Sequence, residues 1–102
     1  MQPKPIGNDN PHMVDLVLQD NPKLNYLLGK YYEIRKKQGI TKYGVALQSH
    51  NGRDAVLDLR DELGDAVLYA RQCIEEGKTG IEPIYEMCLT LLIQVQKQIM
   101  RR

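Results

Sequence analysis

Apolar residues recur at three- and four-residue spacing in each long segment of this 102-residue chain. Such spacing places them on one face of an α-helix, and no segment shows the two-residue alternation of a half-buried strand. Three long helices are predicted: the first from Pro22, the second over about residues 53–76, and the third from about Pro83. The sequence therefore predicts an all-α fold, a small helical bundle.

Helix boundaries are expected where capping residues and glycines fall. Asn21 suits the N-cap of the first long helix, and Pro22 suits its first position, where a missing N–H costs nothing. Gly39 is expected to end this helix, because it follows a basic run that suits a helix C-terminus. A loop is then expected over 39–52, and Gly77 should end the second helix.

Four of the five prolines lie within residues 1–22, which predicts an irregular extension with one short helical stretch, "PHMVDLVLQ". Residues 23–102 are predicted to form the helical domain. Its last helix has apolar residues at nearly heptad spacing: Ile84, Met87, Cys88, Leu91, Leu92, Val95 and Ile99. A chain this short covers such a seam only in part, so we expect a homo-oligomer, most simply a two-fold dimer, with a homotetramer as the alternative.

The composition of the chain limits which classes of partner are expected. A net charge of +1 predicts no polyanion-binding surface, so no nucleic acid is expected as a partner. No segment has the roughly 20 apolar residues of a membrane span, and the N-terminus lacks the apolar core of a signal peptide. Cys73 and Cys88 fall at apolar helix positions and are expected to be buried free thiols. Together these features predict a cytoplasmic protein without a membrane partner.

The segment "NGRDAVLDLRDELGDAVLYARQ" carries an acidic stripe beside its apolar face. At about 100° per residue, one quarter of the helix circumference holds Asp54, Asp58, Glu62 and Asp65. One interpretation is a solvated face, with Asp54 stabilising the helix N-terminus. The other is a metal site, because like charges at this spacing repel and magnesium prefers carboxylate oxygens. Apolar residues on both sides of the stripe are the pattern expected when a cation completes the site, but the spacing alone leaves a solvated or salt-bridged face open as well.

The stretch "DELGDAVLYARQ" resembles the E-x-x-D helix of the MazG-like all-α nucleoside triphosphate pyrophosphohydrolases, with Glu62 and Asp65 as the motif carboxylates. The wider segment "KYGVALQSHNGRDAVLDLRDELGDAVLYARQ" is similar to small phage and prophage members of that group. The resemblance covers roughly residues 23–76. It is carried by the acidic helix together with the KYG loop and the N-G-R-D start that precede it.

This resemblance implies an enzyme that uses magnesium, or manganese in its place, to cleave a nucleoside triphosphate between its α- and β-phosphates. The products would be a nucleoside monophosphate and pyrophosphate. By the same resemblance, Glu62, Asp65 and Asp58 would be the catalytic and metal-binding carboxylates. The substrate would be contacted by Lys42, Tyr43, Asn51 and Arg53.

One feature departs from the family pattern. Members carry an E-x-x-E motif on the preceding helix, whereas here that helix has only Glu33, with Lys30 three residues earlier. Two alternatives follow: Glu33 is the one remaining metal ligand from that helix, or the helix contributes none. The departure leaves two alternatives open: a non-catalytic nucleotide- or protein-binding module with a degenerate metal site, and a purely structural helical adaptor.

Overall fold

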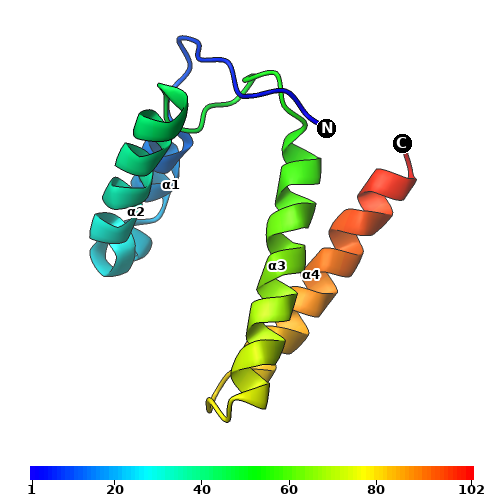
Figure 1. Cartoon of the computed structure of the whole chain (residues 1–102). Helices are drawn as coiled ribbons and strands as arrows, with labels where there is room; N and C mark the ends of the chain where they lie inside the picture. Colours follow the sequence, from blue (N-terminus) through cyan, green and yellow to red (C-terminus); the bar gives the residue numbers. More distant parts are fainter. The chain divides into compact units, whose positions relative to one another are not determined.

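The computed structural model describes all 102 residues, Met1–Arg102, and contains four helices and no strand. These are α1 (Met13–Asp20), α2 (Pro22–Tyr43), α3 (Ala55–Glu75) and α4 (Glu82–Met100), labelled in Figure 1. The predicted all-α fold is confirmed. The chain divides into two compact units, Met1–Arg53 and Asp54–Arg102. The division predicted at residue 22 stays a prediction.

In the first unit, α1 packs alongside α2 (Figure 1). Val14 and Leu18 of α1 are half-buried, as is Tyr32 of α2. An ion pair between the two helices joins Lys36 Nζ to Asp15 Oδ1 at 3.0 Å. Helix α1 is the short helical stretch expected within the proline-rich segment.

Asn21 separates α1 from α2 and stands at the N-cap position predicted for it. Its side chain does not cap α2; it instead donates a hydrogen bond to the Val17 carbonyl at 2.8 Å. Asn21 therefore closes the end of α1, while Pro22 supplies the first residue of α2.

The prediction that Gly39 ends the first long helix is wrong, because α2 continues to Tyr43. Gly44 ends it in the left-handed conformation (φ 80°), and its N–H donates to the Ile40 carbonyl at 2.8 Å. A glycine inside a helix costs only about 1 kcal/mol relative to alanine. The loop that follows is correspondingly shorter than predicted, 44–54.

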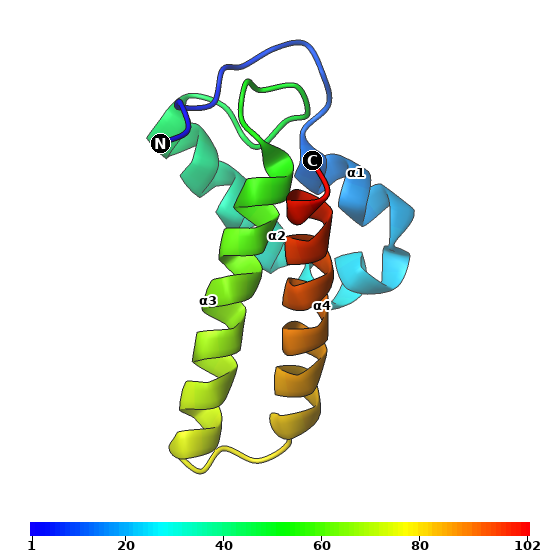
Figure 2. The same cartoon turned by 90° about the vertical axis from the view of Figure 1, so that its right-hand side faces the viewer.

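In the second unit, α3 and α4 form an antiparallel pair joined by a short turn (Figure 2). Gly77 and Gly80 both have φ of 78° in this turn, a conformation that glycine adopts without strain. Buried and half-buried side chains recur at alternating three- and four-residue spacing along both helices. The residues that follow this spacing are, on α3, Val56, Arg60, Leu63, Val67, Ala70 and Ile74, and on α4, Tyr85, Cys88, Leu92, Val95 and Ile99.

The seam predicted for the last helix is only partly right. Ile84, Met87 and Leu91 were expected in it, yet they are 49%, 63% and 45% exposed. The apolar residues of α4 extend around more of the helix than one neighbour covers. Only the stripe that faces α3 is covered, and the second stripe, which contains Ile84, Met87 and Leu91, is exposed to solvent.

The apolar interior is small. Ala46 and Ala70 are the only buried apolar residues, and no large side chain is fully buried. Both cysteines are free, as expected, but they are half-buried rather than buried. None of the four helices combines the length and the apolar character that a membrane span requires.

Asp54 begins α3 and ties its start to the end of α4. Its Oδ1 accepts hydrogen bonds from the backbone N–H groups of Val56 (3.0 Å) and Leu57 (3.3 Å), which is N-capping. The Arg102 guanidinium forms a two-pronged contact with the same carboxylate, with Nη2 3.0 Å from Oδ1. The interpretation of Asp54 as a residue that stabilises the helix start is confirmed.

The hydrogen bond from Arg102, aided by the backbone N–H groups, lowers the pKa of Asp54 from 3.8 to about 2. A lowered carboxyl pKa contributes stability above the unfolded value, and this contribution is lost as the pH falls toward the folded value. We predict that Asp54→Ala lowers the melting temperature by a few degrees at pH 6, and that the difference from wild type shrinks between pH 4 and pH 2. Circular dichroism melts over this range measure it.

The matched control is Asp61→Ala, which removes the same charge from an exposed residue that pairs only with its neighbour Arg60. An Asp54→Ala melt no lower than that of the control would contradict the capping role.

Candidate functional site

The residues predicted for the site come from both units. Glu33, Lys42, Tyr43, Asn51 and Arg53 belong to the first unit. Asp58, Glu62 and Asp65 belong to α3 in the second unit. Each group is described within its own unit.

The acidic stripe occupies the first three turns of α3. Glu62 and Asp65 are exposed and form no ion pair or hydrogen bond through their side chains. Asp58 is half-buried, and its N–H donates to the Asp54 carbonyl at 3.1 Å. Neighbours three or four residues apart in this stripe are within reach of each other across one helical turn.

The side chains of the stripe do not converge on one point. No group of three or more His, Cys, Asp or Glu side chains in the structure is arranged to hold a metal ion. Because Glu62 and Asp65 are exposed and unpaired, nothing holds their rotamers in place. A cation that bound here would have to draw the carboxylates together itself.

Glu33 lies in an open groove between α1 and α2. Among the residues lining this groove are Lys30, Lys36 and Lys37. Lys36 pairs with Asp15, which leaves two lysines beside the single glutamate. The ammonium groups of Lys30 and Lys37 repel a metal ion, so the surroundings of Glu33 suit an anion better than a metal ion.

Lys42 and Tyr43 lie in the last turn of α2, and both are exposed. The Lys42 ammonium stands 5.1 Å from the centre of the Tyr43 ring, a cation–π arrangement. Both side chains are accessible to a ligand from solvent.

Asn51 and Arg53 are held by the rest of their unit. Asn51 is only 8% exposed, and its side-chain oxygen accepts a hydrogen bond from the Arg53 N–H at 3.1 Å. Its carbonyl accepts from the Ile6 N–H at 2.9 Å. The Arg53 guanidinium donates to the Pro3 carbonyl at 2.6 Å. Asn51 therefore shapes the loop from inside, and Arg53 is tied to the N-terminal segment.

Gln48 is the central residue of this loop, and sequence reasoning missed it. It is 6% exposed, and its side-chain amide donates to the carbonyls of Asn8 (2.8 Å) and Asn10 (2.6 Å). Its side-chain oxygen accepts from the Asn8 N–H at 3.1 Å. A backbone hydrogen bond from Met13 to Leu47 extends the pairing. A polar residue in a polar loop gives no sequence signal that it will be buried.

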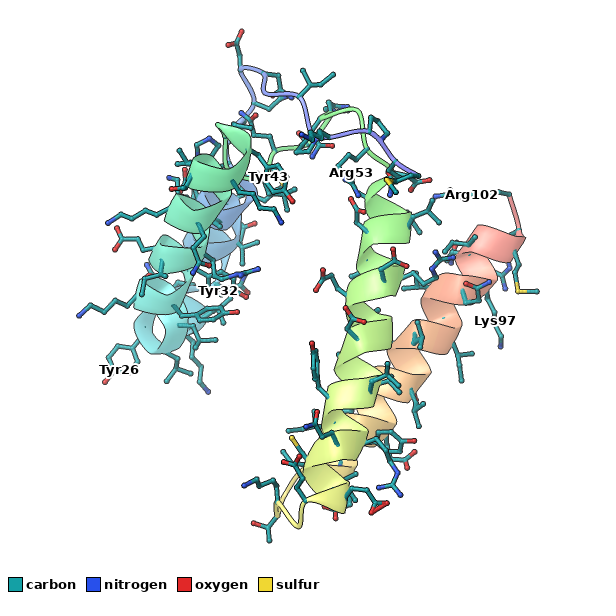
Figure 3. The ribbon with its side chains drawn as sticks, viewed as in Figure 1. Tyr26, Tyr32, Tyr43, Arg53, Lys97 and Arg102 are labelled. Atoms are coloured by element: carbon teal, nitrogen blue, oxygen red, sulfur yellow. The ribbon has the colours of Figure 1, made fainter.

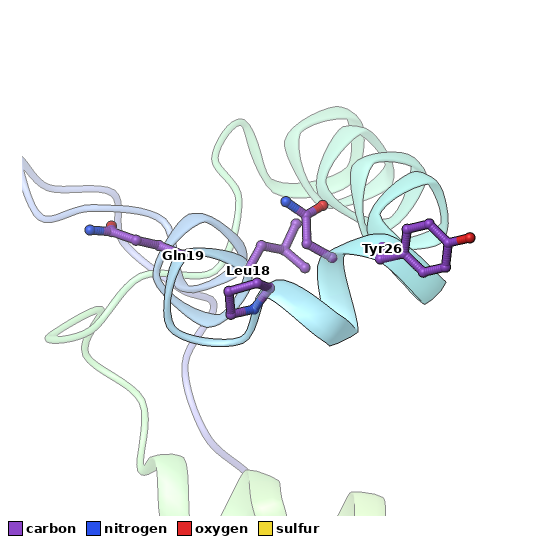
Figure 4. A pocket seen from close by; sticks show the side chains of 5 residues that line it. Leu18, Gln19 and Tyr26 are labelled. Carbon is purple, nitrogen blue, oxygen red and sulfur yellow. The ribbon is translucent and has the colours of Figure 1, made fainter.

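A second open hollow lies at the turn between α1 and α2, lined by Leu18, Gln19, Pro22, Asn25 and Tyr26. Figure 4 shows Gln19 and Tyr26 on opposite sides of it, pointing away. Tyr26 is 89% exposed and projects from the end of the helix pair in Figure 3. No charged side chain lines this hollow, so it offers no cation to a phosphate.

Comparison with protein-family models, curated proteins and solved structures finds no match to this chain.

The loop network predicts the effect of removing Gln48. Gln48→Ala leaves part-buried backbone groups of Asn8 and Asn10 without their protein partner, and the loss of such hydrogen bonds costs about 1 kcal/mol each. We expect faster hydrogen exchange at residues 6–13 and earlier proteolysis there. Gln19→Ala, at an exposed residue whose side chain makes no hydrogen bond, is the control. Equal exchange rates in both variants would mean that Gln48 does not hold the segment.

Proposed function

We propose that this protein is a magnesium-dependent nucleoside triphosphate pyrophosphohydrolase that releases a nucleoside monophosphate and pyrophosphate. The observation that carries the proposal is the row of Asp58, Glu62 and Asp65 on α3, in which Glu62 and Asp65 are exposed and unpaired. The resemblance of this helix to the MazG-like E-x-x-D helix gives the reaction class.

The chemistry explains why such a row is useful. A triphosphate carries several negative charges, so it approaches carboxylates only through a bridging cation. Magnesium binds one or two carboxylates and keeps its remaining positions for water and phosphate oxygens. Glu62 and Asp65 would hold the ion, and Asp58 would bind it or orient the attacking water. A metal ion in this position neutralises charge that develops on the phosphates.

The proposal gives the basic and aromatic residues of the first unit a role with the nucleotide. Lys42 and Tyr43 are exposed, so they are free to meet a phosphate and a base. Arg53 would have to exchange its hydrogen bond to the Pro3 carbonyl for one to a phosphate. A charge-assisted hydrogen bond to phosphate is stronger than a bond to a neutral carbonyl, which favours the exchange.

The direct test is product analysis with magnesium and a panel of ribonucleoside and deoxynucleoside triphosphates. We predict monophosphate plus pyrophosphate, with turnover lowered by ~100-fold or more in Glu62→Ala and in Asp65→Ala, the loss typical of removing a group that stabilises transition-state charge. Asp61→Ala is the matched control, since Asp61 pairs with Arg60 outside the stripe.

Diphosphate plus phosphate would assign the protein to a different reaction class. Turnover that survives in Glu62→Ala and Asp65→Ala would show that the stripe is not the catalytic site.

Metal binding has its own test, because it does not require turnover. A ligand that binds only the folded state raises the melting temperature by mass action. We predict that magnesium or manganese raises it for wild type and for Asp61→Ala, but not for Glu62→Ala. An unchanged wild-type melt at saturating metal would instead support a solvated acidic face.

A second candidate function rests on a different observation. Asn51 is buried inside its loop, and lysines line the groove in which Glu33 lies. No group of three or more His, Cys, Asp or Glu side chains is arranged to hold a metal ion. These features favour a non-catalytic module that binds a nucleotide or a protein with a degenerate metal site. Nucleotide binding by calorimetry without any product would support this candidate over the enzyme.

Self-association is part of the proposal. Many large apolar side chains are exposed on α2, α3 and α4, and a lone chain rarely leaves so much apolar surface in water. We therefore propose a homodimer or homotetramer, in a cytoplasmic setting.

A further inference from the structure

Helix α2 has one side against α1 and another that no part of its own unit covers. The side against α1 includes Gly29, Tyr32 and Lys36, which are half-buried. The opposite side carries an apolar stripe, here named the α2 face, whose members recur at three- and four-residue spacing. It consists of Leu24, Leu27, Leu28, Tyr31 and Ile34, and all but Leu24 are exposed.

A row of lysines borders the α2 face. Lys23, Lys30 and Lys37 are seven residues apart, so they lie on one line two turns apart. All three are exposed, and none forms an ion pair. The helix as a whole carries six Lys or Arg residues against one Glu. The α2 face is therefore an apolar surface with a positive edge.

The second unit also has an uncovered apolar surface, and the charged residues that border it are acidic. At about 100° per residue, five exposed apolar side chains fall on the same side of the antiparallel pair. This surface, here named the α3–α4 face, consists of Leu59, Tyr69, Ile84, Met87 and Leu91. The packing of α3 against α4 covers the residues between the two helices but leaves these five exposed.

The acidic stripe borders the α3–α4 face. Asp58 and Asp65 are seven residues apart, as the lysines are, and Glu62 lies between them. Glu62 and Asp65 are exposed without an ion pair. Helix α3 carries five Asp or Glu residues against two Arg. Each of the two faces thus consists of apolar residues bordered by a row of charged residues at heptad spacing. The row beside the α2 face is positive, and the row beside the α3–α4 face is negative.

We propose that the α2 face of one copy docks on the α3–α4 face of a second copy. Heptad-spaced charges beside an apolar stripe select helix partners, as they do at the edges of coiled coils. In such a pair each copy offers one face and receives the other, which removes apolar surface of both copies from water. The apolar residues supply the binding energy and the charged rows set the orientation.

Charge decides between this arrangement and a pair made by two α3–α4 faces. Two such faces would bring two acidic stripes together, and like charges across an interface disfavour association. The lysine row spans about 21 Å and the stretch from Asp58 to Asp65 about 10 Å, at 1.5 Å per residue. Two neighbouring lysines therefore match the length of the acidic stripe.

The docking is compatible with the proposed function and does not require it. A carboxylate has two oxygens and about four lone-pair sites, so one group accepts from a lysine and still binds a cation. The lysines of a second copy would then stand next to the phosphates of a bound nucleotide. Association is measured without metal or nucleotide, so its failure and the failure of the enzyme proposal are separate results.

The test is a charge exchange between two variants. The first carries Lys23→Glu, Lys30→Glu and Lys37→Glu; the second carries Glu62→Lys and Asp65→Lys. Each variant alone sets like charges against each other at both contacts, so we expect its dissociation constant to rise at least about tenfold in sedimentation velocity. A 1:1 mixture restores opposite charges at both contacts, so we expect it to form a heterodimer with the wild-type constant.

The matched control reverses three exposed lysines that belong to neither face: Lys4→Glu, Lys78→Glu and Lys97→Glu. Figure 3 shows Lys97 pointing away from α4. We expect this control to associate as wild type does, and circular dichroism confirms that each variant is helical. A monomeric wild type, a variant that self-associates as tightly as wild type, or a mixture that stays monomeric would each overturn the proposal.

Discussion

The packing of α3 against α4 determines which residues of the second unit remain available to other molecules. Each helix turns one apolar stripe inward along a seam of three- and four-residue spacing. The helices have more apolar residues than this seam accommodates, so Leu59, Met87 and Leu91 stay exposed. The acidic stripe lies at the edge of the same outward surface. The site proposed for metal and the surface proposed for docking are thus both consequences of one helix contact.

The charges of the two units follow the same division. Helix α2 is basic beside its apolar stripe, and α3 is acidic beside its own. Exposed charges of one sign repel each other weakly in water, and a cation or an oppositely charged surface relieves the repulsion. Magnesium and the lysine row of a second copy are the two partners proposed for α3. Both roles depend on Glu62 and Asp65 being unpaired within their own unit.

Local patterns predicted the helices well because helix periodicity and capping are local properties. Pro22 and the segment around Asp54 start helices as expected. Gly39 misled because its helix penalty is small, and the left-handed stop came five residues later at Gly44. Gln48 could not be found, because its burial depends on Asn8 and Asn10 some forty residues earlier. The pairing of α3 with one stripe of α4 rather than the other is likewise a tertiary choice, invisible in a single helix. The acidic stripe, in contrast, could be predicted from the sequence, because it depends only on the spacing of residues within one helix.

The proposed function requires the carboxylates of α3 to bind a divalent cation. Manganese is paramagnetic and broadens the amide signals of residues close to it, so titrating the ¹⁵N-labelled protein with substoichiometric manganese locates the ion directly. We predict broadening centred on residues 58–65, reversed by excess magnesium. Unbroadened signals there, or equal broadening at exposed acidic residues away from the stripe such as Glu75 and Glu86, would contradict it.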